Sequence, residues 1–207
     1  RREAGGLKRN IDRHAWNGEY FIRAFADSGD KVDFNDAVVQ SWAVLSGASN
    51  KNKASAARAR KAIGAAVKSL YKEKHNMVLL FDRPLDNEEW GGSLAAYPNG
   101  LRENNAQYTH GSSWLPRALA QLCDGDRAMT LYKAMLPNVH HQQDGARYGA
   151  EPYAVAADIY GGAKAGEGGW SWYTGAAGWI LRTGLDSLLG IQFREGDRVD
   201  AREQPAR

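Results

Sequence analysis

Two short segments of the chain combine polar side chains with large aromatic rings, as ligand-binding sites do. Tyr97–His110 reads YPNGLRENNAQYTH, and Trp170–Trp179 reads WSWYTGAAGW. Carboxylates and amides bond in pairs to neighbouring hydroxyl groups, and aromatic rings cover the apolar faces of a pyranose. The first segment is therefore typical of a neutral-sugar site, although its polar side chains can equally cap a helix and bond to one another. Trp170 and Trp172 can line the same cleft, whereas Trp179 is expected in a helix core.

Both segments lead into the beginning of an expected helix, where free backbone amides and a partial positive charge favour an anion. His110 precedes the expected helix 112–122, and its imidazole can either donate to a phosphate or cap that helix. Thr174 precedes the expected helix 175–189. Its hydroxyl can cap the helix, and Gly175 lets a ligand approach the backbone amide closely. The residue types leave both interpretations open at each helix start.

Other candidate groups favour structural roles. His140 and His141 are adjacent and face different directions, so we expect a solvated loop rather than a metal site. Asp33 and Asp36 could form a carboxylate pair, but Asp36 is better placed as a helix cap. The single cysteine, Cys123, excludes an internal disulfide or a cysteine-based metal cluster and is expected to be a buried thiol. No metal and no cofactor are predicted.

The composition indicates a folded, soluble protein with no nucleic-acid partner. The chain has 27 basic and 24 acidic residues and a formal charge of +3, without the basic stripe of a phosphate-tracking surface. No apolar run approaches the roughly 20 residues needed to span a bilayer. The first ten residues, RREAGGLKRN, contain no apolar signal-peptide core. A cytoplasmic location is therefore expected.

Apolar periodicity predicts a mainly α-helical chain with short β elements. The expected helix pairs are 36–47 with 53–73, 112–122 with 126–136, and 152–160 with 174–189. The run MVLLF (77–81) predicts a short strand, and 191–200 predicts a β-hairpin that turns at Glu195–Asp197. Helix pairs that alternate with long loops are typical of an α/α toroid. Three helical hairpins would make about half of an (α/α)6 barrel and would leave an apolar face exposed.

Six blocks of the sequence resemble glycoside hydrolase family 94, a family of inverting phosphorylases of β-glucosides. They are AWNGEYFIRAF, QSWAVLSGA, YPNGLRENNAQYTH, GDRAMTLYKAMLPNVHH, EPYAVAADIY and GGWSWYTGAAGW. Their wording is most similar to the phosphorylase-like domain of cyclic β-1,2-glucan synthases and to 1,2-β-oligoglucan phosphorylases. The resemblance implies that residues 1–190 are the C-terminal half of an (α/α)6 catalytic barrel, that 191–200 begin a β element, and that 201–207 are a tail.

The resemblance also implies a reaction, in which inorganic phosphate attacks the anomeric carbon while an aspartic acid protonates the leaving oxygen. The product is α-glucose 1-phosphate, and phosphate is a co-substrate rather than a cofactor. The positions that match the family's phosphate site are His110, Thr174 and Gly175, and those that match its acceptor-sugar site are Tyr97, Arg102 and Glu103. The implied partners are a β-glucan oligosaccharide and inorganic phosphate.

The sequence also departs from the family pattern. The family's general acid lies in an Asp-Trp-Asn-Asp-Gly segment upstream of the block AWNGEYFIRAF, and a phosphate-binding arginine also comes from upstream. We therefore expect no catalytic residue in this chain and no activity from the chain alone. Asn17 stands where the family usually has Asp, and ENNAQYTH replaces the usual ENGGQYTH, which removes two glycines beside the sugar site.

Two alternatives to a phosphorylase role remain open. One is a non-catalytic carbohydrate-binding module that uses the same aromatic cleft. The other is a structural fragment or split subunit, which needs an upstream partner that carries the missing half of the barrel, or which associates with itself. If the chain is part of a glucan synthase, its expected location is the cytoplasmic face of the inner membrane.

Overall fold

The computed structural model of the 207-residue chain describes residues 2–48, 52–85, 91–194 and 198–201. Its α-helices are α1 (Arg2–Asn10), α2 (Ala37–Leu45), α3 (Lys53–Leu70), α4 (Gly92–Ala95), α5 (Thr109–Ser112), α6 (Trp114–Gln121), α7 (Gly125–Lys133), α8 (Pro137–Tyr148) and α9 (Thr174–Arg182). Short 3-10 or π-helical turns are η1 (Ile11–Ala15), η3 (Glu73–His75), η5 (Gly162–Lys164) and η6 (Thr183–Leu188). The described part of the chain is thus mainly helical, as predicted.

The strands of the described residues form two-stranded antiparallel sheets. They are β1 (Ala24–Phe25) with β2 (Lys31–Val32), β3 (Tyr71–Lys72) with β4 (Met77–Val78), β5 (Gln107–Tyr108) with β6 (Asp158–Ile159), and β7 (Ile191–Arg194) with β8 (Arg198–Ala201). The β7–β8 pair confirms the hairpin predicted for 191–200. Its predicted turn at Glu195–Asp197 and the tail residues 202–207 lie outside the described residues.

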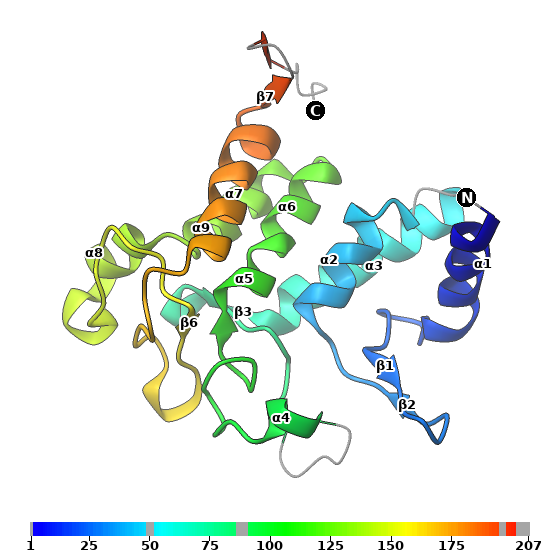
Figure 1. Cartoon of the computed structure of the whole chain (residues 1–207), viewed down its shortest axis with the longest axis horizontal. Coiled ribbons are helices and arrows are strands. Elements are labelled where there is room, and N and C mark those ends of the chain that lie inside the picture. Colours follow the sequence, from blue (N-terminus) through cyan, green and yellow to red (C-terminus); the bar gives the residue numbers. More distant parts are fainter. Residues whose placement is uncertain (1, 49–51, 86–90, 195–197, 202–207) are drawn as a thin grey trace.

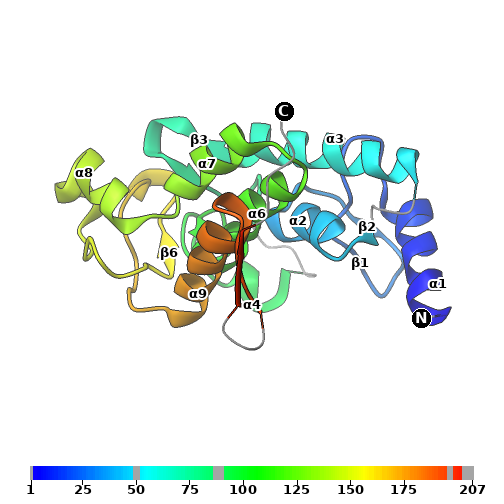
Figure 2. The same ribbon diagram turned by 90° about the horizontal axis from the view of Figure 1, so that it is seen from above.

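The longer helices stand in two rows, as expected for part of a helical barrel. Figure 2 shows α2, α6 and α9 in one row and α3, α7 and α8 in a second row beside it. Helix α2 packs on both α3 and α6, and α6 packs on α7. The apolar core fills the space between the rows, where its central side chains are at most 1% exposed; they include Val44, Ile63, Leu70, Leu115 and Leu131.

Helix α2 begins where the sequence predicts because Asp36 caps it. The backbone N–H groups of Val38 and Val39 donate to Asp36 Oδ1 at 2.6 and 3.1 Å. The second oxygen, Oδ2, accepts from the guanidinium of Arg23, which lies 5.2 Å from the centre of the Phe81 ring. Asp36 is fully buried, and burial raises its pKa. The cap and the ion pair together satisfy a carboxylate that would otherwise be costly to bury.

The first helix of the third predicted pair is wrong. Residues 152–160 form turns followed by β6, and the backbone of β6 bonds to β5 on one side and to Glu167–Gly169 on the other. Its spacing of apolar residues fits a helix as well as an extended segment, so partners from distant parts of the chain decide the outcome.

Helix α8 was not predicted. Its segment was expected to be a solvated loop around His140 and His141. Pro137 occupies its first turn, where a missing N–H costs little. His140 is buried, its Nε2 lies 2.8 Å from the carbonyl oxygen of Ala134, and its ring stacks on that of Tyr148. The solvated-loop prediction is therefore wrong for His140, whereas His141 is exposed.

Three smaller corrections concern segment ends. Helix α3 stops at Leu70, because the next two residues pair with Met77–Val78, and this pairing also limits the strand predicted at 77–81. Cys123 is exposed rather than buried, in the left-handed turn (φ 61°) between α6 and α7. Thr174 is the first residue of α9 instead of its cap, and Tyr173 takes the cap position without a side-chain bond. No helix in the described ranges is long and apolar enough to cross a membrane.

We predict that Asp36→Ala lowers the free energy of unfolding by about 2–4 kcal/mol, since it removes a helix cap and leaves the Arg23 guanidinium without its carboxylate. Asp36→Asn should cost less, because asparagine also caps helices. Asp30→Asn, in the exposed turn before β2, is the matched control and should change stability by less than about 0.5 kcal/mol. Urea unfolding of the three variants measures the differences, and equal stability of Asp36→Ala and wild type would contradict the assignment.

Candidate functional site

The pairing of β5 with β6 joins the two segments that the sequence singled out. The N–H of Thr109 donates to the carbonyl of Ala157 at 2.8 Å, and the N–H of Gly161 donates to Gly100 at 2.9 Å. Strand β5 continues directly into α5, and the segment after β6 leads into α9. In Figure 1 the N-terminal ends of α2, α5 and α9 all face the loops along the lower edge. Two helix beginnings that are far apart in sequence therefore lie side by side.

His110 of α5 lies against Gly175 of α9. A methyl group built on Gly175 would lie 3.1 Å from both Cε1 and Nδ1 of His110, so only glycine leaves the imidazole its present position. Thr174, the neighbour of Gly175, is exposed at the same helix start. We call His110, Thr174 and Gly175 the anion corner. It combines an imidazole, a hydroxyl and the amides of a helix start, which together suit a phosphate.

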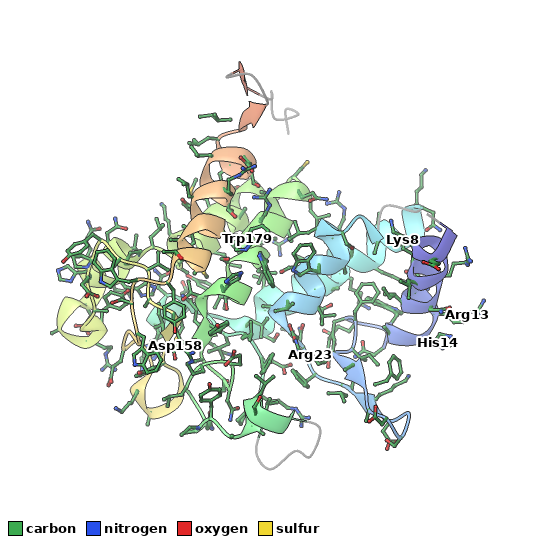
Figure 3. All side chains as sticks on the ribbon, viewed as in Figure 1. Lys8, Arg13, His14, Arg23, Asp158 and Trp179 are labelled. Carbon is green, nitrogen blue, oxygen red and sulfur yellow. The ribbon has the colours of Figure 1, made fainter. Side chains whose placement is uncertain are left out.

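Two indoles contact the imidazole of His110, and a third packs against both of them. The imidazole ring centre lies 5.3 Å from that of Trp114 and 6.5 Å from that of Trp179, and these two indoles contact each other edge to face at 5.6 Å. Trp42 adds edge contacts to both indoles. Figure 3 labels Trp179 on α9. Burial lowers the pKa of His110 below its ordinary 6.5, so the ring is mostly neutral at pH 7 and offers one N–H donor.

A pocket of about 430 Å³ opens next to the anion corner, and two arginines border it. Its lining consists of Arg117, Thr174, Gly175, Gly178, Trp179 and Arg182. Arg117 Nη2 and Arg182 Nε both donate to Oδ2 of Asp186, at 3.4 and 2.7 Å. Among the described residues, the buried Nη1 of Arg117 has no hydrogen-bond partner. Two cations that share one carboxylate leave this pocket positively charged.

Neither arginine was predicted as a site residue, although each follows a predicted site residue at a helical spacing. Arg117 follows His110 by seven residues, and Arg182 follows Gly175 by seven residues. Seven residues are about two helical turns, so Arg182 lies on the same face of α9 as Gly175, whereas Arg117 belongs to α6 and His110 to α5.

Among the residues predicted to bind the acceptor sugar, Arg102 has its guanidinium surrounded by aromatic rings. Arg102 Cζ lies 5.2–5.9 Å from the centres of four rings, those of Trp170, Tyr108, Tyr173 and Tyr97. Tyr108 and Tyr173 directly precede the two helix starts. Within the described structure, the buried atoms Arg102 Nη1 and Glu103 Oε2 have no hydrogen-bond partner. Such atoms are costly to bury unpaired, so water or ligand hydroxyls should satisfy them.

Asp158 positions Arg102, and the sequence analysis missed it. Its Oδ2 accepts from the backbone N–H of Arg102 at 2.9 Å, which holds Arg102 in a left-handed conformation with φ 53°. Asp158 is 2% exposed, and burial raises its pKa (Figure 3). A methyl group on Gly169 would lie 2.1 Å from Asp158 Oδ1. Asp158 was not predicted as a site residue because its segment, 152–160, was expected to form a helix.

Two tryptophans of the segment Trp170–Trp179 lie at the molecular surface. Trp172 is 66% exposed and donates from Nε1 to Glu151 at 3.2 Å, while its ring contacts Tyr153. Trp170 is also 70% exposed, although it covers Arg102. Trp170 and Trp172 thus expose apolar ring faces to solvent, and Trp170 does so beside Arg102.

Comparison with known proteins gives a consistent result. The model of the glycosyl hydrolase 94 superfamily, catalytic domain, matches residues 1–190. The cyclic beta-(1,2)-glucan synthase NdvB of Rhizobium meliloti (strain 1021) is 37% identical over 209 residues, which cover 96% of this chain and 7% of that protein. The N,N'-diacetylchitobiose phosphorylase of Vibrio furnissii is 30% identical over 91% of this chain and 24% of its own length. The solabiose phosphorylase of Paenibacillus borealis is 26% identical over 89% of this chain and 24% of its own length. The chain thus spans less than a quarter of each of these relatives.

We predict that Gly175→Ala displaces the His110 imidazole, because the new methyl group would lie 3.1 Å from two ring atoms. Histidine-selective NMR should show a changed His110 resonance. Gly178→Ala is the matched control: it lies in the same helix with no atom within 4 Å of the new methyl group, and it should stabilise the protein by about 0.5–1 kcal/mol. An unchanged His110 resonance in Gly175→Ala would contradict the contact.

Proposed function

This chain belongs to the glycosyl hydrolase 94 superfamily, and from that membership we propose that it is part of a glycoside phosphorylase domain that cleaves β-glucosidic bonds with inorganic phosphate. The observation that carries the proposal is the contact between His110 and Gly175. It gathers an imidazole, the Thr174 hydroxyl and the start of α9 at one place, and the rings of Tyr108 and Tyr173, which directly precede the two helix starts, contact the Arg102 guanidinium. A phosphate and a sugar would then be neighbours.

The proposed chemistry is phosphorolysis with inversion. An oxygen of phosphate attacks the anomeric carbon, the bond to the glycosidic oxygen breaks, and a general acid gives its proton to that oxygen, which yields α-glucose 1-phosphate. His110, Thr174 and the amide of Gly175 donate hydrogen bonds to the phosphate and orient it for attack. The positive end of α9 favours the anion. No carboxylate base is needed, because phosphate is itself the nucleophile.

The acceptor side of the sugar chain would lie against Tyr97, Arg102 and Glu103. The Arg102 guanidinium, held between aromatic rings, donates to hydroxyl groups, and the Glu103 carboxylate accepts from them. The similarity to a cyclic beta-(1,2)-glucan synthase supports a β-1,2-glucan as the substrate. We propose that the general acid comes from sequence outside these 207 residues, so that turnover belongs to a longer protein or to a complex with a partner chain. A cytoplasmic location remains our expectation.

Sugar binding without chemistry is the second candidate. The exposed indoles of Trp170 and Trp172 favour it, because stacking surfaces open to solvent suit a carbohydrate-binding module. The two functions differ in whether phosphate binds at the anion corner.

We predict that the chain binds phosphate and a β-1,2-gluco-oligosaccharide at separable places. His110→Ala should weaken phosphate binding by about tenfold or more and leave oligosaccharide binding unchanged, since one donor to the anion is lost. Arg102→Ala should weaken oligosaccharide binding and leave phosphate binding unchanged. Isothermal titration measures both, with His14→Ala as the control for an exposed histidine remote from the site. Oligosaccharide binding with no response to phosphate would favour the binding module and refute the phosphorylase proposal.

We also predict that the purified chain alone forms no detectable sugar phosphate from a β-1,2-gluco-oligosaccharide and phosphate. A general acid contributes about 10²–10⁴-fold to such a reaction, and here it would be absent. Phosphorus NMR of the reaction mixture measures the product, and a phosphorylase incubated with its own substrate verifies detection. Formation of glucose 1-phosphate by the isolated chain would show that it holds its own acid.

A further inference from the structure

A second polar pocket, of about 460 Å³, lies between three segments that take no part in the site described above. We call it the α8 pocket. It is lined by Lys74 and His75 of η3, by His140, Gln143, Asp144 and Arg147 of α8, by Gly162 and Ala163 of η5, and by the loop residues Ala165 and Gly166. Its volume falls within the range of roughly 300–1,000 Å³ that is typical for pockets that hold small molecules. No Phe, Tyr or Trp is among these lining residues.

The side chain of Arg147 is fixed at the wall of this pocket. Its Nη1 donates to the carbonyl of Ala165 at 3.2 Å, and its Nε lies 3.5 Å from Asp144 Oδ2. A methyl group on Gly166 would lie 3.0 Å from Arg147 Cδ and 3.6 Å from His75 Nδ1. Arg147 and His75 therefore border the same glycine, so the guanidinium and the imidazole lie close to each other.

Cationic groups outnumber anionic ones in and beside the α8 pocket. An adjoining pocket of about 280 Å³ shares His75, Gly162 and Ala165 with it. The charged groups that line the two pockets are Lys72, Lys74, Asp82, Asp144 and Arg147. Burial and then the charges of Lys74 and Arg147 lower the pKa of His75. The potential at the imidazole is thus positive, which favours a bound anion.

We propose that the α8 pocket binds a small phosphate ester of a sugar. The phosphate would lie against Lys74, His75 and Arg147, where point charges and a guanidinium fork suit its oxygens. Hydroxyl groups would bond to Gln143 and Asp144, whose side chains offer both donors and acceptors. The pocket has room for more than a bare phosphate ion, and its lining offers no aromatic ring besides imidazole on which a nucleobase would stack.

The α8 pocket is distinct from the anion corner and from the residues proposed to bind the acceptor sugar, Tyr97, Arg102 and Glu103. The extended backbone at Gly161 separates them: its N–H donates to Gly100, and a methyl group there would lie 2.1 Å from the carbonyl oxygen of Asn105. One layer of backbone thus stands between the pocket and the loop that carries Arg102. None of the proposed contacts depends on phosphorolysis, so this proposal and the proposed function can fail independently.

The chain's five histidines allow one experiment to read both sites. In histidine-selective NMR, His75 reports on the α8 pocket and His110 on the anion corner. His14, in η1 at the opposite end of the molecule from α8 (Figures 1 and 3), is the internal control. The protein is titrated separately with inorganic phosphate, a hexose 1-phosphate and the neutral hexose.

We expect the hexose 1-phosphate to shift the His75 resonances and to raise the His75 pKa, because a nearby anion stabilises the imidazolium. Inorganic phosphate should need a concentration about tenfold higher for the same shift, and neutral hexose should have no effect. An unchanged His75 during titration with the hexose 1-phosphate would overturn the proposal. Equal potency of inorganic phosphate would overturn the sugar-ester part of it. A response of His110 alone would support the anion corner and overturn the α8 pocket.

Two matched variants test the charge contacts. Arg147→Gln should weaken binding of the hexose 1-phosphate at His75 by about tenfold or more. Arg127→Gln should leave it unchanged, although Arg127 forms the same kind of i, i+3 pair with Asp124, at similar exposure, on α7. Lys74→Gln provides a second test on η3, and an unshifted His140 resonance verifies that α8 is intact. Equal binding by Arg147→Gln, Lys74→Gln and wild type would overturn the proposal.

Discussion

The pairing of β5 with β6 is the constraint on which the candidate site depends. Gln107 anchors β5 in the core: its Oε1 accepts from Val78 N–H at 2.7 Å, and its Nε2 donates to Ala134 at 3.3 Å. Strand β6 then pairs in register with β5, α5 follows β5 directly, and the segment after β6 leads into α9. The backbone bonds bring the two helix starts together, and the contacts with Trp114 and Trp179 then orient the imidazole toward Gly175.

Local sequence signals predict most of the helices. The helix predicted over 152–160 failed because this segment pairs with a distant strand. Asp36 and Asn52 both bond to the first turn of the helix that follows them, so α2 and α3 begin where the sequence indicates. Residues 152–160 become turns and a strand because β5, about 50 residues earlier, supplies the bonding partner. Helix α8 was missed because its residues are mostly polar. The burial of His140, which arises from tertiary packing, cannot be read from neighbours in sequence.

The sequence predicted those residues of the candidate site whose type and local position are enough to suggest ligand binding. His110, Thr174 and Gly175 stand at helix starts, which residue type and position reveal. Asp158 accepts from the backbone N–H of Arg102, 56 residues away, and His110 of α5 contacts indoles of α6 and α9. Such roles arise where segments meet, so sequence reasoning finds the groups that would bind a ligand more readily than those that orient them.

Asn105 and Ala106 stand at two positions where the family resemblance implies glycine, and the structure accommodates both side chains. Asn105 takes one glycine position and keeps a left-handed conformation with φ 65°, which asparagine adopts more readily than most residues. Its Nδ2 donates to Asn99 at 2.9 Å. Ala106 takes the other position, and it is fully buried, with its carbonyl bonded to Leu80 N–H. One new side chain is tied to its own loop and the other packs in the core, so neither needs to occupy the space beside Arg102.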